Sequence, residues 1–157
     1  MERRAHPYRD IDVVDTRAVR TNQAVIGVLA LVAITTGPRW LLALLAFQLA
    51  LGLTLGRRWC LACVVYYEVI QPRFGEGPLE DSRPPRFANM VGFAFLTAAS
   101  VVNVLDVSTA GAVLGGIVSA LALLAAVTGF CAGCTAYRLG YVLSGRKFVS
   151  CPLPPPL

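Results

Sequence analysis

The chain has 157 residues, of which 56% are hydrophobic, and a formal net charge of +5. Its mean hydropathy of +0.64 is too high for an ordinary soluble domain, and its length leaves no room for a second domain. A net positive charge can indicate nucleic-acid binding, but here the basic residues gather beside the apolar segments. We therefore predict no nucleic-acid partner.

The chain begins with a charged segment, residues 1–20, which contains Pro7. This segment lacks the apolar core of a signal peptide. We expect it to be retained rather than cleaved.

Long apolar segments follow, each close to the roughly 17–25 residues that a membrane-spanning helix needs. We place them at residues 23–36, 40–56, 87–103 and 110–129. The first is short and would need residues on either side. Four such segments cannot all be buried in so small a soluble protein, so the sequence predicts an all-α membrane protein surrounded by a lipid bilayer.

Residues 57–71 mix aromatic and apolar side chains with flanking charge, which favours a helix lying at the membrane interface. We expect Pro72 to end this helix. A connector rich in proline and glycine, residues 74–85, then leads to the third apolar segment.

The basic residues are distributed unevenly around the apolar segments. Five arginines precede the first segment, five lie between the second and third, and three basic residues follow the fourth. Only Arg39 lies in a loop on the other side. Because basic flanks resist translocation, this asymmetry predicts a multi-pass protein of the bacterial plasma membrane with both termini in the cytoplasm.

Two halves of the chain share a pattern. Asp-Thr-Arg-Ala-Val-Arg at residues 15–20 matches Asp-Ser-Arg-Pro-Pro-Arg at residues 81–86, and each half ends in aromatic-Cys-x-small-Cys-x-x-Tyr, at residues 59–66 and 130–137. Since each half has two spans, both halves enter the membrane from the same side. We predict two parallel two-helix repeats.

These expectations divide the chain into five parts. They are a cytoplasmic N-terminal segment (1–20), a first repeat with the interfacial helix (21–73), a cytoplasmic connector (74–86), a second repeat (87–140) and a cytoplasmic tail (141–157).

The cysteines are the candidates for chemistry. Cys60 and Cys63, like Cys131 and Cys134, are three residues apart, which brings two sulfurs to one helix face. Such pairs suit redox or sulfur chemistry, and thiolates are the reactive form. If the two pairs meet, the four sulfurs could instead hold zinc or iron. The remaining alternative is that they are small apolar residues in a packing surface.

Cys151, in the proline-rich tail, is the fifth cysteine. It could accept or resolve a bond with another thiol, or be incidental.

The repeated acidic and basic motifs have two interpretations. Asp15 and Asp81 are suited to cap the first amides of a helix, and the arginines suit topology and lipid phosphates. Alternatively, the arginines form an anion or lipid-phosphate site, made of Arg17, Arg20, Arg83 and Arg86.

No ionisable residue lies near the middle of any predicted span, which argues against a coupled ion transporter or proton pump. The one histidine, His6, lies in the N-terminal segment, which weakens haem and non-haem iron interpretations.

The run at residues 81–88, together with Gly-Phe-Cys-Ala-Gly-Cys at residues 129–134, resembles a bacterial membrane family of unknown function that is common in actinobacteria and their relatives. The resemblance covers most of residues 12–140. It implies a similar number of spans and an association with thioredoxin-like or rhodanese-like sulfur proteins. Cys131 and Cys134 match the family pattern directly, whereas Cys60 and Cys63 are less typical of it.

The sequence thus predicts thiol-disulfide exchange or sulfur transfer by Cys131 and Cys134, with Cys60 and Cys63 as exchange partner and a quinone as a candidate acceptor. Whether the protein is an enzyme stays open. The alternative functions are a cysteine-ligated zinc or iron site or an accessory subunit of a larger membrane complex, and a carrier for a small sulfur species or metal ion. A homo-oligomer or a larger membrane complex is the expected kind of assembly.

Overall fold

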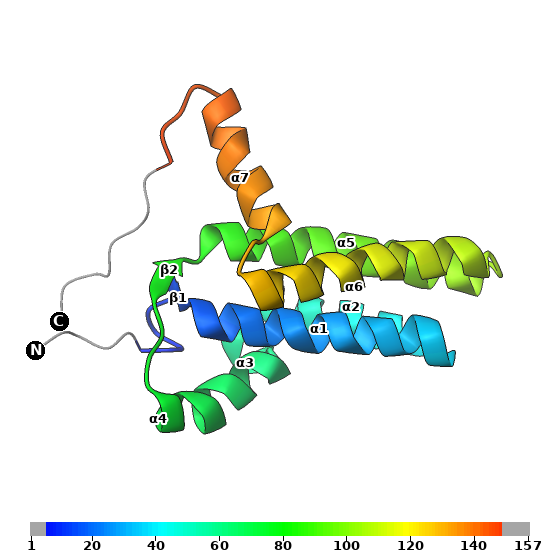
Figure 1. The fold of residues 1–157 in the computed structure, drawn as a ribbon, viewed down its shortest axis with the longest axis horizontal. Helices are drawn as coiled ribbons and strands as arrows, with labels where there is room; N and C mark the ends of the chain where they lie inside the picture. Colours follow the sequence, from blue (N-terminus) through cyan, green and yellow to red (C-terminus); the bar gives the residue numbers. More distant parts are fainter. Residues whose placement is uncertain (1–5, 149–157) are drawn as a thin grey trace, which may run out of the picture.

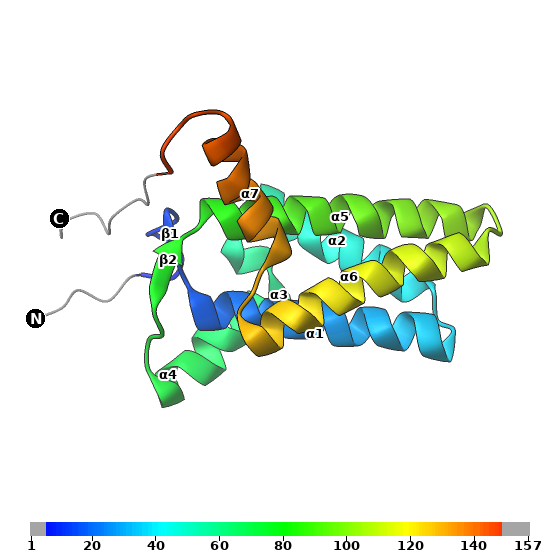
Figure 2. The ribbon, with the colours of Figure 1, turned by 45° about the horizontal axis from the view of Figure 1, so that its top comes forward.

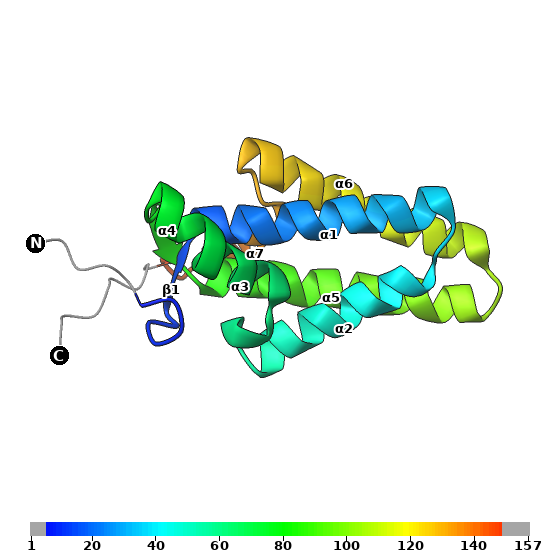
Figure 3. The same ribbon diagram turned by 90° about the horizontal axis from the view of Figure 1, so that it is seen from below.

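A computed structural model describes residues 6–148 (Figure 1). Four long helices run side by side along the main axis of the molecule (Figures 1–3). They are α1 (Thr16–Thr36), α2 (Trp40–Thr54), α5 (Arg83–Val104) and α6 (Ser108–Thr128). Short connections join α1 to α2 and α5 to α6 at one end, while all the smaller elements lie at the other end (Figure 1).

Three of the described helices, α1, α5 and α6, are long and apolar enough to cross a membrane, which indicates a membrane protein. The prediction of a largely helical membrane protein is confirmed at this level. Helix α1 begins at Thr16, seven residues before the predicted segment, because the Asp15 side chain accepts a hydrogen bond from Arg17 N and caps the helix. Helix α2 is apolar but shorter, and ends at Thr54.

The core of the bundle combines large and small apolar side chains. Helix α1 packs mainly against α6, and α2 packs mainly against α5 (Figure 3). Ser119 of α6 donates to the Gly27 carbonyl of α1 at 2.8 Å, and a Cβ at Gly27 would lie 2.7 Å from the Leu123 side chain. Small residues therefore bring these two helices unusually close, as is typical of membrane helix pairs.

Outward-facing side chains of the long helices are apolar as well. Examples on four helices are Val28, Phe47, Val101 and Leu121. Helices that are apolar on all sides suit a lipid environment.

The segment after α2 is more irregular than predicted. A 3-10 turn (Arg57–Trp59) leads into α3 (Leu61–Val65), a π-helical turn (Tyr66–Ile70) and α4 (Gln71–Phe74). The expectation that Pro72 ends the helix was wrong, since α4 continues to Phe74. Pro72 lies in the first turn of α4, where a missing N–H costs little.

Two elements were not predicted. A 12-residue helix, α7 (Ala132–Leu143), follows α6 and projects away from the bundle (Figures 1 and 2). Strands β1 (Val13–Asp15) and β2 (Leu79–Asp81) pair in antiparallel fashion, with Val14 opposite Glu80. This pairing joins the segments in front of α1 and α5.

Candidate functional site

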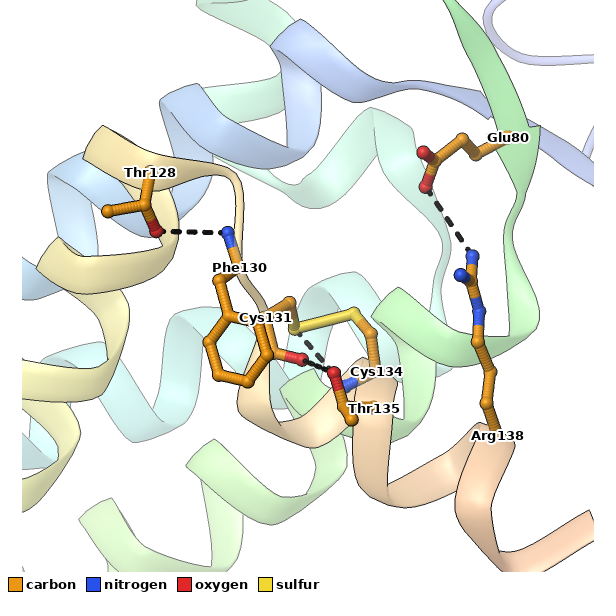
Figure 4. Close-up of a disulfide and its surroundings, with 7 residues drawn as sticks. All are labelled: Glu80, Thr128, Phe130, Cys131, Cys134, Thr135 and Arg138. Carbon is orange, nitrogen blue, oxygen red and sulfur yellow. Dashed lines mark hydrogen bonds and ion pairs between the residues drawn. A yellow bond between two sulfur atoms is a disulfide. The ribbon is translucent and has the colours of Figure 1, made fainter. Parts of the chain in front are cut away.

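Each Cys-x-x-C pair is arranged so that its own sulfurs can bond. The Cα atoms are 5.2 Å apart in Cys60 and Cys63, and 5.1 Å apart in Cys131 and Cys134. In both pairs the sulfurs lie at disulfide distance, as Figure 4 shows for the second pair. The backbone of each pair therefore has the Cα spacing that a disulfide requires.

The second pair opens helix α7. Gly129 ends α6 in the left-handed region, with a φ of 78°, and turns the chain. Cys131 is the residue before α7, and its sulfur accepts a hydrogen bond from Cys134 N at 3.2 Å (Figure 4). A thiolate at this position is stabilised by that amide and by the positive end of the helix dipole.

Helix α7 can begin where it does because the chain has a glycine between the two cysteines. A Cβ at Gly133 would lie 2.7 Å from the Ala88 Cβ and 2.8 Å from the Ala88 Cα. The second pair is thereby held directly against α5.

The first pair lies deeper in the bundle. Cys60 is buried, and its sulfur lies 3.5 Å from Oδ1 of Asn22 on α1. In the dithiol form Cys60 would carry a proton that it could donate to this oxygen. Gln48 of α2 donates to the Trp59 carbonyl at 3.0 Å and fixes the backbone next to Cys60.

Two cavities adjoin the cysteine pairs. The larger, of about 420 Å³, is lined by both Cys60 and Cys63 and is called the Cys60 cavity below. The smaller, of about 150 Å³, is mostly apolar and is lined by Cys131. Leu49 and Asn89 line both, so the two pairs flank a shared part of the bundle.

Arg57 connects the N-terminal segment to the first pair. Its guanidinium donates to the carbonyls of Pro7, Asp10, Ile11 and Val13. Burial lowers the pKa of the Arg57 guanidinium below its usual range, although the group stays charged. Arg57 also lines the Cys60 cavity, where it contributes positive charge.

In each motif the second arginine binds backbone carbonyls at the end of a helix in the other half of the chain, a contact called an arginine clamp below. Arg20 of α1 donates to the Ala126 and Val127 carbonyls at the end of α6, at 2.9 and 2.8 Å. Arg86 of α5 donates to the Leu53 carbonyl at the end of α2, at 3.2 Å. Each motif thus holds the backbone just before the cysteine pair of the other half.

The first arginines of the motifs have partners of their own. Arg17 donates to the Phe74 carbonyl at 3.3 Å, and Arg83 forms a two-pronged ion pair with Asp81, with a shortest distance of 2.7 Å. The four arginines do not share one contact site in these interactions. Anion or lipid-phosphate binding by them stays a prediction.

The two aspartates of the motifs accept hydrogen bonds from the first backbone amides of α1 and α5, and Asp15 has further donors. Asp15 accepts from Arg17 N at 2.8 Å, and Asp81 accepts from Arg83 N at 2.9 Å. Asp15, which is 2% exposed, also accepts from Tyr66 Oη and Gly77 N, both at 2.8 Å. Burial and the Asp15 carboxylate raise the pKa of the Tyr66 hydroxyl.

The four sulfurs do not form one ligand set. Among residues 6–148, no three His, Cys, Asp or Glu side chains gather in a group that could hold a metal ion. Cys151 lies outside the described residues. The zinc or iron alternative stays a prediction, to be tested by metal analysis of anaerobically purified protein.

Sequence reasoning missed Asn22, Asn89 and the carbonyl contacts of Arg57. A single amide in an apolar helix carries no signal of its own. Tyr66 was visible as the end of a repeated motif, but its partner Asp15 is 51 positions away. Only the packing of α3 and the π-helical turn against α1 brings them together.

In the comparison with protein families, a domain of unknown function (DUF4395) matches residues 14–141. Comparison with curated proteins and with solved structures gave no match. The expected resemblance to a family of unknown function is confirmed, over nearly the range that carried it. Because the matched region is most of the chain and includes both cysteine pairs, this protein belongs to the DUF4395 family.

Proposed function

We propose that Cys131 and Cys134 exchange thiols and disulfides with a soluble thioredoxin-like protein at the edge of the membrane. The observation that carries this proposal is the position of the Cys131 sulfur, which accepts the Cys134 amide at the start of α7 and lies at disulfide distance from Cys134. A stabilised thiolate beside a resolving thiol is the arrangement that such exchange requires.

The reaction proceeds in two displacements. The Cys131 thiolate attacks one sulfur of the partner disulfide, which forms a mixed disulfide and releases one partner thiolate. Cys134, as its thiolate, then attacks the Cys131 sulfur, which closes the internal disulfide and releases the second partner thiolate. Two electrons pass from this chain to the partner, and the reverse sequence returns them.

A trapping experiment tests these roles. With Cys134→Ser, a reactive Cys131 should form a mixed disulfide with a thioredoxin that keeps one active-site cysteine, activated as its thionitrobenzoate disulfide. Thionitrobenzoate leaves and no second thiol can release the adduct, so it is visible on a non-reducing gel. With Cys131→Ser, the adduct should be at least about tenfold less abundant, because the stabilised thiolate is gone. A Cys60→Ser, Cys63→Ser protein is the matched control and should exchange normally. Equal trapping by both single variants would contradict the assignment.

Transfer of a persulfide from a rhodanese-like donor would use the same sulfur. Cys131 would take the outer sulfur, and Cys134 would release it as sulfide while closing the disulfide. Mass spectrometry of Cys131 after incubation with a persulfidated rhodanese tests this variant of the proposal.

We infer further that the chain crosses the membrane four times as two parallel repeats, with both cysteine pairs on the cytoplasmic side. Three observations support this arrangement. The basic flanks lie at one end of the bundle, the clamps of Arg20 and Arg86 are reciprocal, and Val14 pairs with Glu80, the residues that the motif alignment makes equivalent.

Labelling tests the orientation. A membrane-impermeant maleimide should modify reduced Cys131 and Cys134 in inside-out vesicles and not in intact cells. Labelling in intact cells instead would place the pair on the outer side and remove the soluble cytoplasmic partner from the proposal.

A further inference from the structure

The Cys60 cavity lies between three helices of the bundle. Its walls come from α1, α2 and α5, and the N-terminal segment covers one side through Ile11 and Asp12. Helices α1 and α5 are long and apolar enough to cross a membrane, so a ligand with an apolar tail would have a route to the cavity along them.

The apolar surface and the volume of this cavity suit a ligand with a flat, uncharged ring that carries polar atoms at its edge. Ala18, Val19, Leu49, Leu53 and Pro85 supply apolar surface. The volume of about 420 Å³ falls within the range of roughly 300–1,000 Å³ that small-molecule sites occupy.

The polar side chains in the wall are mainly hydrogen-bond donors. Asn22 and Asn89 carry amide N–H groups, and Asn22 can accept from the Cys60 thiol through Oδ1 while still offering two N–H donors. The donors of the three arginines in the wall are engaged by the protein, because Arg57 and Arg86 bind backbone carbonyls and Arg83 binds Asp81. The amide N–H groups of Asn22 and Asn89 suit the carbonyl oxygens of a neutral ring.

We propose that the Cys60 cavity binds the ring of a lipid-soluble quinone, which takes electrons from the Cys60 and Cys63 dithiol. This inference rests on the proposed function, since it supplies the acceptor for electrons that thiol exchange brings to the chain. The two S–H bonds break and one S–S bond forms. The two protons and two electrons convert the quinone carbonyls to the hydroxyls of the quinol.

A binding experiment tests the site independently of redox turnover. The chain contains two tryptophans, so Trp40→Phe leaves Trp59, the neighbour of Cys60, as the only reporter. Titration of the oxidised protein in nanodiscs with decylubiquinone should quench Trp59 fluorescence in a saturable way. Asn22→Leu and Asn89→Leu should each raise Kd about tenfold, the cost of a lost hydrogen bond.

Asn103→Leu is the matched control, because Asn103 lies near the other end of α5 and does not line the Cys60 cavity. It should bind decylubiquinone like the parent. Circular dichroism checks that all variants are folded. Quenching that does not saturate would overturn the site, and so would equal affinities of the folded Asn89 and Asn103 variants for decylubiquinone.

A second experiment tests electron transfer in a Cys151→Ser background. The reduced Cys131→Ser, Cys134→Ser protein should lose two thiols for each quinone reduced, while the reduced Cys60→Ser, Cys63→Ser protein should react at least about tenfold more slowly. Equal rates, or no quinol at all, would refute the inference. Either failure leaves the trapping result at Cys131 untouched, so the two proposals fail separately.

Discussion

The Asp15 side chain organises the region around the first cysteine pair. Its two oxygens together accept from the backbone of α1, the Tyr66 hydroxyl and the backbone of Gly77. A buried carboxylate is tolerated when such donors surround it. Asp15 therefore ties the start of α1 to the π-helical turn and to the connector.

Tyr66→Phe removes one of these donors and leaves a buried carboxylate oxygen short of a partner. We expect the variant to be less stable by about 1–3 kcal/mol. Thermal unfolding in detergent, followed by circular dichroism, measures the loss. Tyr141→Phe on α7 is the control and should change stability much less, because the Tyr141 hydroxyl makes a long contact of 3.4 Å with the hydroxyl of Tyr137 and the ring is kept.

The Tyr66 hydroxyl also makes the stability of the protein depend on pH. The pKa of Tyr66 in the folded protein is raised above the ordinary value of 10.0. Its contribution to stability is therefore complete below about pH 10 and is lost as the pH rises through the folded pKa. The stability difference between the parent and Tyr66→Phe should narrow in alkaline solution. A difference that stays constant up to the pH of alkaline unfolding would contradict the role of this proton.

At the scale of elements, the arginine clamps connect one half of the chain with the cysteines of the other. Arg20 holds the last carbonyls of α6, a few residues before Cys131, although it lies more than 100 positions away in sequence. Arginine is suited to this because its rigid fork of donors can hold two carbonyls at once.

Arg20→Ala should free the end of α6 and slow disulfide exchange at Cys131 by about tenfold, at a stability cost of about 1–2 kcal/mol. The rate at which reduced thioredoxin opens the Cys131–Cys134 disulfide measures the effect. Arg86→Ala, which loosens the end of α2 instead, is the matched comparison and should leave this rate near that of the parent. A stronger effect from Arg86→Ala would show that the clamps do not act on the pairs as the contacts indicate.

Some elements could be predicted from sequence and others could not, for physical reasons. The apolar segments predicted the long helices, and the capping side chain of Asp15 indicated where α1 begins. Helix α7 was missed because its start depends on the turn at Gly129 and on the close fit of Gly133 to Ala88, which is a tertiary contact. The continuation past Pro72 depends on the π-helical turn before it, which has no simple sequence signal.

For the whole molecule, the sequence indicated the candidate cysteine pairs but not which residues surround them. The cysteine pairs and their flanking motifs were recognisable because they recur in order. The packing of α1 against α6 and of α2 against α5 determines the Cys60 cavity, the amides that line it and the arginine clamps of Arg20 and Arg86. Such long-range pairings are not encoded in local patterns.

The central claim is that Cys131 and Cys134 change redox state reversibly with a soluble thiol partner. It can be measured in the chain with Cys60, Cys63 and Cys151 replaced by serine, so that only this pair remains. The protein in nanodiscs is incubated with reduced or oxidised thioredoxin, alkylated, and analysed by mass spectrometry. Two alkylated thiols per chain after the reduced thioredoxin and none after the oxidised one is the predicted result. An alkylation state that is the same under both conditions would contradict it.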